Sequence, residues 1–375
     1  AGIYTTGTIS TTANTNISNN KSSGGGGIFG ADTSTLNING TPIKNNTAQG
    51  GGGGICSHGT LNLNNATLTG NTGGAIWYNK GTISKSTITG NTSNNLGGGV
   101  SLSHGTSTVS DTSISNNKAN DGGGMYTDGN LTINNCTYDS NTASGNGGGI
   151  ISNGTVTMNS GSITNNYSGW DGGGVNSRAT FNFNGGAIQN NTAYWLGGNI
   201  HVQAVDNINN KQSVFTVTSK NPISGGKAEG SGGGGVCVYG TGAKLILNDG
   251  TSVKDNTAPT GGGINGNATI EMHNATISGN KATSNNGGGI ELFSDQYGTG
   301  SFKMTSGTIE NNTATCEGGG FHGPNFTMTG GTIQKNNAGT VAGGVLVNGT
   351  GACSMSGGTI TNNTSTYSGG GLWVD

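Results

Sequence analysis

The sequence is poor in charged residues, and this scarcity excludes several classes of partner. Only 8% of the 375 residues are charged, the formal net charge is −2, and Arg178 is the sole arginine. Electrostatic binding of nucleic acid or of an anionic membrane needs clustered lysine and arginine, and the sequence contains no basic run. We therefore expect no nucleic acid and no membrane surface among its partners.

Long apolar runs are also missing. No stretch approaches the roughly 18 apolar residues of a membrane-spanning helix. The chain begins at Ala1 rather than at an initiator methionine, and it starts and stops at the same phase of a repeat that fills it. We expect a processed product or a segment of a longer chain, whose ends either continue or associate end to end.

Cysteine is scarce and irregularly spaced. The five cysteines show neither the even, regular spacing of a disulfide framework nor the short paired spacing of a zinc site. We expect no bound metal and no other cofactor.

Glycine, in contrast, is abundant and marks the repeat. There are 78 glycines, many in clusters, and one apolar anchor residue follows each cluster. The anchors have an average spacing of about 26 residues, which is typical of a solenoid. They are Ile3, Ile28, Ile55, Ile76, Val100, Met125, Ile150, Val175, Ile200, Val236, Ile264, Ile290, Phe321, Val345 and Leu372.

Each repeat contains three short runs of alternating apolar residues, separated by Gly, Asn, Ser and Asp. Such runs are too short for helices and are typical of strands and turns. The sequence therefore predicts an all-β fold, a single-domain parallel β-helix over 1–375 with about 14 coils of about 26 residues. The crossover rule makes a right-handed coil the default. We expect a longer loop insertion at about 203–233, where the anchor spacing is widest.

One asparagine per coil follows the apolar residue of the third run by three positions. An asparagine amide donates and accepts, and asparagine tolerates a left-handed backbone, so equivalent residues of successive coils can form a hydrogen-bonded ladder at a tight turn. We predict a structural ladder that is interrupted only at Gly226. Its members are Asn20, Asn46, Asn71, Asn91, Asn117, Asn141, Asn166, Asn191, Asn256, Asn280, Asn312, Asn336 and Asn363.

This combination of motifs resembles the repeats of chlamydial polymorphic outer-membrane proteins and of adhesin-like β-helix proteins from gut bacteria and archaea. The GGAI motif of that family occurs at 73–76, and its FxxN motif occurs at 181–184. In other coils isoleucine replaces the phenylalanine. The resemblance implies an extracellular or cell-surface protein that acts in adhesion or as a structural fibre.

Asn-x-Ser/Thr sequons are frequent, although a composition so rich in Asn, Ser and Thr produces many by chance. Each is a candidate for N-glycosylation in a secreted protein. Those we single out are Asn39, Asn65, Asn130, Asn153, Asn267, Asn325 and Asn348.

A polysaccharide lyase or hydrolase is the alternative, because many such enzymes are parallel β-helices. Hydrolysis needs two carboxylates that converge across a sugar. Asp121 and Asp171 occupy equivalent positions two coils apart, but aspartate is a common turn residue and we interpret them so. Glu291 and Asp295 share a loop and have no evident partner. The five histidines do not gather at one coil position and predict neither a triad nor a metal site; they are His58, His104, His201, His273 and His322.

Aromatic residues are the most informative feature of the expected surface. Stacked aromatics on a rigid face suit the apolar faces of sugar rings. The best predicted glycan-binding patch consists of Tyr167, Trp170, Asp171, Tyr194 and Trp195. The outward position beside the anchors adds Trp77 and Tyr126 to the candidates, and it also holds Tyr4, Phe29, Trp373, His201 and His322. The alternative is that these rings cover the glycine corners or form a packing interface.

Ice binding is a remote alternative, suggested by a column of outward threonine and serine on the third run. A flat array needs a matching second column, and Lys44, Asp139, Gln189, Lys254 and Glu310 interrupt it. The β-propensity of threonine explains the column. The sequence thus favours a non-catalytic adhesive rod or a self-associating surface fibre.

Overall fold

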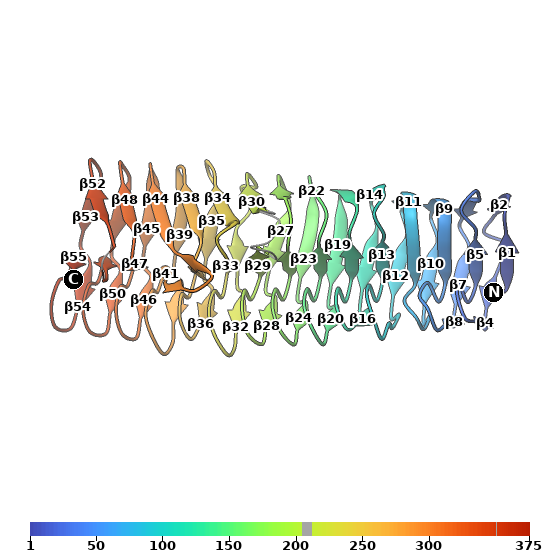
Figure 1. The fold of residues 1–375 in the computed structure, drawn as a ribbon, viewed down its shortest axis with the longest axis horizontal. Coiled ribbons are helices and arrows are strands. Elements are labelled where there is room, and N and C mark those ends of the chain that lie inside the picture. Colours follow the sequence, from blue (N-terminus) through green and yellow to red (C-terminus); the bar gives the residue numbers. More distant parts are fainter. Residues whose placement is uncertain (205–211, 350) are drawn as a thin grey trace. The chain divides into compact units, whose positions relative to one another are not determined.

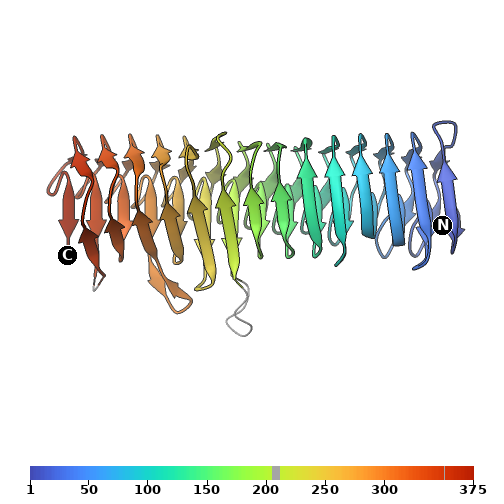
Figure 2. The same cartoon turned by 90° about the horizontal axis from the view of Figure 1, so that it is seen from above.

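The computed structural model describes residues 1–204, 212–349 and 351–375, and in these residues it contains strands and turns but no helix. The chain divides into two compact units, 1–169 and 170–375. Each unit is a parallel β-solenoid whose coils follow one another in chain order (Figures 1 and 2). The units contain about 15 turns between them, which confirms the fold class and comes close to the predicted number of coils. That they form a single domain stays a prediction.

Most complete coils have four strands rather than the three predicted. In the coils that begin at β9 (Ile55–Asn64) and β11 (Ile76–Ser84) the first two strands are continuous, and isolated bridges at Thr72 and Thr92 take the place of the fourth. In the first unit a representative coil contains β17 (Met125–Thr127), β18 (Asn130–Asn134), β19 (Cys136–Asp139) and β20 (Thr142–Ala143). In the second unit the equivalents are β33 (Val236–Tyr239), β34 (Ala243–Leu247), β35 (Ser252–Lys254) and β36 (Thr257–Ala258). The fourth strand has only two residues, which is too short to show an alternating pattern in the sequence.

The strands pair in parallel, in register, with the equivalent strands of the next coil. Met125 pairs with Val100 on one side and with Ile150 on the other, and all three side chains are fully buried. Burying one such side chain contributes roughly 1.5–3 kcal/mol. The anchors from Ile28 to Val345 are all buried, so the predicted aliphatic columns form the core of each unit.

The asparagine ladder is present in the first unit. Each ladder side chain donates from Nδ2 to the Oδ1 of its equivalent in the next coil, as Asn91 does to Asn117 at 3.0 Å and Asn117 to Asn141 at 3.1 Å. The same Oδ1 atom also accepts the backbone N–H of the preceding coil's asparagine, and the Nδ2 of Asn117 bonds to the carbonyl of Ile88 at 3.0 Å. The ladder runs in this way from Asn20 to Asn166.

In the second unit the ladder continues through the coil in which the sequence predicted an interruption. At Gly226 the missing amide is replaced by that of Asn199, which comes from the glycine corner of the same turn. Asn191 donates to Asn199 at 2.9 Å, and Asn199 donates to Asn256 at 3.1 Å. From Asn256 the ladder proceeds regularly to Asn363. Sequence reasoning missed Asn199 because it lies 27 positions before the vacant one.

The left-handed residue of this turn is not the ladder asparagine, as we expected, but the residue before it. Asn116 has φ 54° and Asn165 has φ 56°, whereas Asn117 and Asn166 are absent from the positive-φ residues. The ladder residue must direct its side chain inward, and its neighbour makes the turn. Asn, Gly, Asp, Ser and Lys all occupy that neighbouring position.

The predicted loop at 203–233 is wrong for much of its length. Residues 205–211 lie outside the described residues, but the remainder contains β30 (Ser213–Val217), β31 (Ile223–Ser224) and β32 (Lys227–Ala228). β30 pairs with β34, and it buries Phe215 and Val217. These strands complete an ordinary coil, and the wide spacing of the anchors misled the prediction.

Candidate functional site

The first unit carries a run of aromatic rings along the position beside the anchors. The strands are β1 (Ile3–Thr5), β5 (Ile28–Gly30), β9 (Ile55–Asn64) and β11 (Ile76–Ser84), which pair in that order. Pairing places Tyr4 beside Phe29, Phe29 beside Cys56, and Cys56 beside Trp77. The sequence prediction of an aromatic column is therefore confirmed here, except that cysteine interrupts it.

His58 fills the place that cysteine leaves vacant. Its ring centroid lies 5.3 Å from that of Phe29 and 4.7 Å from that of Trp77. Tyr4 and Phe29 stack at 5.5 Å with an interplanar angle of 6°. The four rings, which we call the aromatic run, therefore form a continuous face across four coils. Sequence reasoning placed His58 in a different column and missed this contact.

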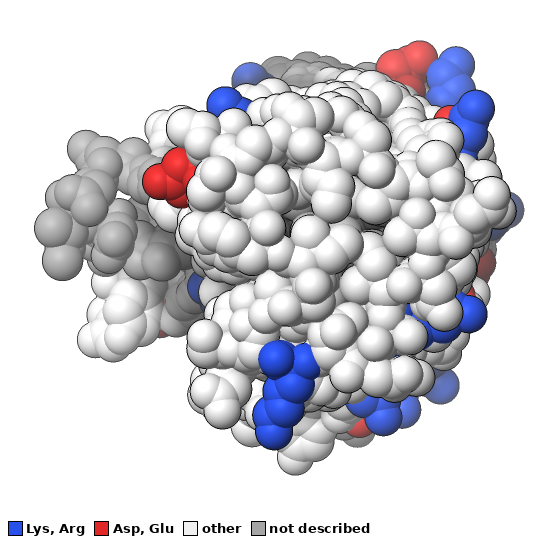
Figure 3. All heavy atoms as spheres, turned by 90° about the vertical axis from the view of Figure 1, so that its right-hand side faces the viewer, with Lys and Arg blue, Asp and Glu red and all other residues white. Residues whose placement is uncertain are grey.

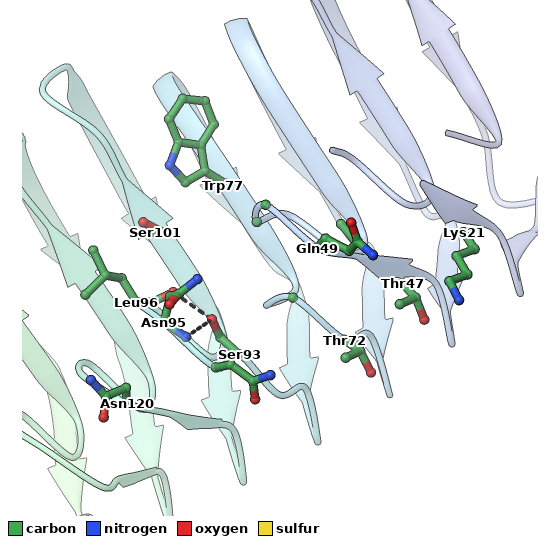
Figure 4. Close-up of a pocket in the computed structure, with 15 residues that line it drawn as sticks. Lys21, Thr47, Gln49, Thr72, Trp77, Ser93, Asn95, Leu96, Ser101 and Asn120 are labelled. Carbon is green, nitrogen blue, oxygen red and sulfur yellow. Dashed lines mark hydrogen bonds between the residues drawn. The ribbon is translucent and has the colours of Figure 1, made fainter. Parts of the chain in front are cut away.

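A hollow of about 700 Å³ adjoins the aromatic run (Figure 4). Lys21 and Asn120 lie at its two ends, Gln49 and Asn95 lie between them, and Trp77 stands along one side. Ser93 fixes the loop beneath, because its hydroxyl donates to the carbonyl of Leu96 and accepts from the N–H of Asn95, each at 3.2 Å. None of the residues that line this hollow is acidic. We call it the groove.

The predicted patch around Trp170 is only partly assembled by the structure. In the second unit Trp170, Tyr194 and Trp195 are 60%, 47% and 48% exposed, and the rings of Tyr194 and Trp195 meet edge to face at 5.3 Å. The N–H of Trp195 donates to the carbonyl of Trp170 at 2.9 Å. Tyr167 is exposed at the end of the first unit and is described only within that unit.

The predicted turn role of Asp121 and Asp171 agrees with their contacts. Asp121 accepts the N–H of Asn146 at 2.6 Å, and Asp171 accepts that of Leu196 at 3.2 Å. Each carboxylate thereby joins its own corner to the corner of the following coil.

Tyr126, another predicted binding residue, is half-buried and held by neighbours. Its hydroxyl donates to Asp128 at 2.7 Å and accepts from the amide of Asn153 at 2.9 Å. A ring fixed in this way is less free to adapt to a ligand than Trp77.

In the second unit the position beside the anchors is buried from Asn176 to Leu346, so the prediction that it faces outward is wrong for these residues, whereas Trp373 at the end of the column is 37% exposed as predicted. It holds Asn176, His201, Cys237, Asn265, Glu291 and His322 in pairing order, and all six are buried. The glycine corner of each coil folds over this position. A Cβ atom added to Gly318, which has φ +61°, would lie 2.6 Å from the Cβ of His322.

The two buried histidines, His201 and His322, have carboxylate neighbours that the sequence did not reveal. His201 Nδ1 lies 3.6 Å from Asp171 Oδ2. Burial lowers the pKa of His201. The charge of Asp171 offsets part of this decrease, and that of Arg178 adds to it. His322 lies between Glu291 and Glu317, with contacts of 2.8 and 3.4 Å.

The expectation that Glu291 and Asp295 have no partner is therefore wrong for both. Besides the contact of Glu291 with His322, Asp295 accepts from Asn267 at 2.7 Å and from Tyr239 at 3.1 Å. These contacts come from other coils, so spacing within one loop could not show them.

The candidate glycosylation sites differ in accessibility. Asn39, Asn65 and Asn130 are exposed. Asn267 is fully buried and its amide nitrogen bonds to Asp295, so the folded chain does not offer it to a glycosyltransferase. The amide nitrogens of three more are already engaged: those of Asn153, Asn325 and Asn348.

Among residues 1–204, 212–349 and 351–375, no group of three or more His, Cys, Asp or Glu is placed to hold a metal ion. The same residues include no helix long and apolar enough to cross a membrane. No protein-family model, no curated protein and no solved structure matches the chain.

Proposed function

We propose that the chain is a non-catalytic, extracellular adhesive module that binds glycans along the aromatic run and in the adjoining groove. The observation that carries this proposal is the continuous face of Tyr4, Phe29, His58 and Trp77 beside a hollow lined by amides and hydroxyls. Flat rings pack on the apolar faces of sugars, and the amides and hydroxyls bond to sugar hydroxyls. Paired strands hold these rings, so little conformational entropy is lost on binding.

Binding is favoured over hydrolysis because the groove has no acidic residue in its lining. Glycoside hydrolysis requires a pair of carboxylates beside the scissile bond. Uncharged residues cover most of the N-terminal end that Figure 3 shows, and Lys21 is the one charged residue in the groove lining, so a neutral ligand is the natural partner.

The ice-binding alternative receives little support from the threonine columns. In the first unit Ser115 donates to Thr89 at 3.2 Å, Thr69 donates to the carbonyl of Thr89 at 3.0 Å, and Asp139 accepts from Thr164 at 2.8 Å. Hydroxyls already bonded within the protein do not present a uniform array.

The test of the glycan proposal is a glycan array followed by calorimetry with the 375-residue chain. We expect Trp77→Ala and Phe29→Ala each to weaken binding by about tenfold or more, as aromatic anchors do at interfaces. Tyr367→Ala is the matched control, since it removes an exposed aromatic ring from the other unit. Wild-type affinity in both first-unit variants would refute the assignment, and release of new reducing ends would favour the enzyme.

A self-associating fibre subunit is the second form of this proposal, and it includes the predicted end-to-end association. The outer edges of β1 and of β55 (Leu372–Val374) carry no strand partner among the described residues, and such edges can pair with another chain. Electron microscopy of natively isolated material distinguishes a fibre subunit from a single adhesive module. Coils that stack across chain boundaries would establish the fibre, and separate particles would favour a single module. The resemblance to surface adhesins likewise stays a proposal.

A further inference from the structure

A second cavity, of about 700 Å³, lies in the second unit and shares no lining residue with the proposed groove. It opens beside β41 (Ile290–Leu292), at the base of the hairpin formed by β42 (Ser294–Asp295) and β43 (Gly298–Thr299), which projects from that unit (Figure 2). Its volume falls within the range of small-molecule sites, about 300–1,000 Å³. The lining residues that matter here are Glu291, Phe293, Ser294, Thr299, Asn325 and Asn348.

Glu291 is an unusual residue for this wall, because only 8% of it is exposed. Its Oε2 lies 2.8 Å from Nδ1 of His322, the neighbouring residue on β47 (Phe321–Gly323). The other ring nitrogen of His322 lies 3.4 Å from Glu317 Oε2 and 3.5 Å from the amide nitrogen of Asn348. A buried carboxylate is therefore fixed at the cavity, and the histidine holds it there as a positioning residue.

The fold itself does not require this polar pair. The position of Glu291 and His322 is occupied by the buried Ile151 in the first unit and by the buried Leu346 one coil after His322. A buried ion pair costs desolvation, and apolar residues of similar volume are often neutral or more stabilising. Apolar residues in place of Glu291 and His322 would therefore pack the core equally well. We take the presence of the carboxylate as an indication that the cavity binds a ligand.

The chemistry of the wall selects the ligand. The cavity lining includes the carboxylate of Glu291 but no lysine or arginine. A second carboxylate, that of Glu317, lies on the other side of His322. Anionic ligands are therefore disfavoured. Phe293 is half-buried and presents a ring, while the remaining polar groups are amides and hydroxyls. An aromatic face with a few directed hydrogen-bonding groups suits a sugar ring.

We propose that this cavity binds one unit of a neutral saccharide, with Phe293 against the sugar ring and with Glu291 and Asn348 bonding to its hydroxyls. The site is separate from the aromatic run of the first unit, so the failure of one proposal does not affect the other. Only one carboxylate lines the cavity, so the site binds rather than hydrolyses.

Titration calorimetry and saturation-transfer NMR with the 375-residue chain test the proposal. The probes are neutral cello-, xylo-, manno- and N-acetylchito-oligosaccharides, with oligogalacturonate as the acidic probe and deacetylated chito-oligosaccharides as the cationic one. We expect at least one neutral probe whose affinity falls about tenfold or more in Phe293→Ala and in Glu291→Gln. Tyr367→Ala, which removes an exposed aromatic ring elsewhere in the second unit, should leave that affinity unchanged.

Phe293 is partly exposed and Glu291→Gln keeps the side-chain shape, so both variants should fold, and a melting curve verifies this. Absence of any neutral probe whose binding depends on Phe293 overturns the proposal. Tighter binding of the acidic or cationic probe at the same residues also overturns it, because the site would then recognise charge. Loss of binding only in Trp77→Ala leaves the first-unit proposal standing and removes this one.

Discussion

At the level of single residues, asparagine stabilises the turns because one amide can satisfy both of its neighbours. Asn117 accepts two hydrogen bonds from Asn91 and donates two, to Ile88 and Asn141. All four bonds are buried, where an unpaired donor or acceptor costs about 1–3 kcal/mol. A serine hydroxyl could donate only one of the two bonds, and leucine could form none of them.

Replacement of a ladder asparagine should therefore be costly. We expect Asn117→Ala to lower the free energy of unfolding by roughly 2–4 kcal/mol, because it leaves several buried backbone groups unpaired. Urea unfolding followed by circular dichroism measures this. The exposed Asn94→Ala is the control and should change stability by less than about 0.5 kcal/mol. Equal stabilities of the two variants would show that the ladder contributes nothing.

The buried histidines respond to pH in opposite directions. Burial lowers the pKa of His322, but Glu291 and Glu317 raise it more, so that its pKa lies above the usual 6.5. Burial raises the pKa of Glu291. His322 offsets only part of this increase, and the negative charge of Glu317 adds to it. Asn286 and Asn348 are the other polar neighbours of His322, and both are uncharged. For His201 burial dominates, and its pKa lies below 6.5.

A raised histidine pKa gives stability that is fully present below pH 6.5 and is lost as the pH rises through the folded value. We therefore expect the stability difference between wild type and His322→Gln to be larger at pH 5 than at pH 8. For His201→Gln the sign reverses, because protonation of His201 below pH 6.5 opposes folding. The urea midpoints of wild type, His322→Gln and His201→Gln at pH 5 and pH 8 measure these differences. If the midpoints of all three proteins changed equally with pH, the two pKa shifts would be contradicted.

At the level of the coil, one turn shows how the same hydrogen bonds can be built from a different position. Most coils place asparagine after the left-handed turn residue and glycine at the corner, as in Asn256 and Gly235. In the coil of Gly226 the two residue types are exchanged: glycine follows the left-handed turn residue, and Asn199 occupies the corner. A Cβ atom on Gly226 would lie 2.5 Å from the amide nitrogen of Asn199, so the two positions cannot both carry a side chain.

This exchange predicts a coupled pair of substitutions. Asn199→Gly removes the ladder amide and should cost roughly 2–3 kcal/mol, and Gly226→Asn should also destabilise because it meets Asn199. The double variant supplies the ladder amide from the usual position and removes the clash with Asn199, so it should be more stable than Gly226→Asn alone; the carbonyl oxygen of Gly234, 2.2 Å from a Cβ atom at this position, still has to shift. A double-mutant cycle in urea measures the coupling. Additive losses would mean that the two positions act separately.

Over the length of the chain, each coil contacts mainly its neighbours, as the strand pairing from one coil to the next shows within both units. Stability in such arrays is close to a sum of coil terms and nearest-neighbour terms. A local defect should therefore open locally rather than unfold every coil.

Hydrogen exchange can test this locality. We expect Asn117→Ala to accelerate amide exchange in peptides covering residues 88–141, whose ladder bonds it breaks, and to leave peptides covering 280–336 unchanged. Mass spectrometry of wild type and variant under native conditions gives both values. Uniform acceleration along the chain would show that the molecule opens as one cooperative unit.

The repeat could be recognised from the sequence alone, because columns of Ile and Asn recur at a spacing that only stacked coils can satisfy. The sequence also indicated the aromatic column at Tyr4, Phe29 and Trp77, since residues at equivalent positions of successive coils become neighbours. Contacts that depend only on position within the repeat could be predicted in this way.

Contacts that leave the repeat became visible only in the folded chain. His58 enters the aromatic run, Asn199 replaces a missing amide, and Glu291 meets His322 under a glycine corner. These contacts depend on how far a side chain reaches and on which loop covers it, and a period of about 26 residues carries no record of either. The sequence therefore predicted the scaffold of each unit, and the structure was needed to find the groove and the cavity.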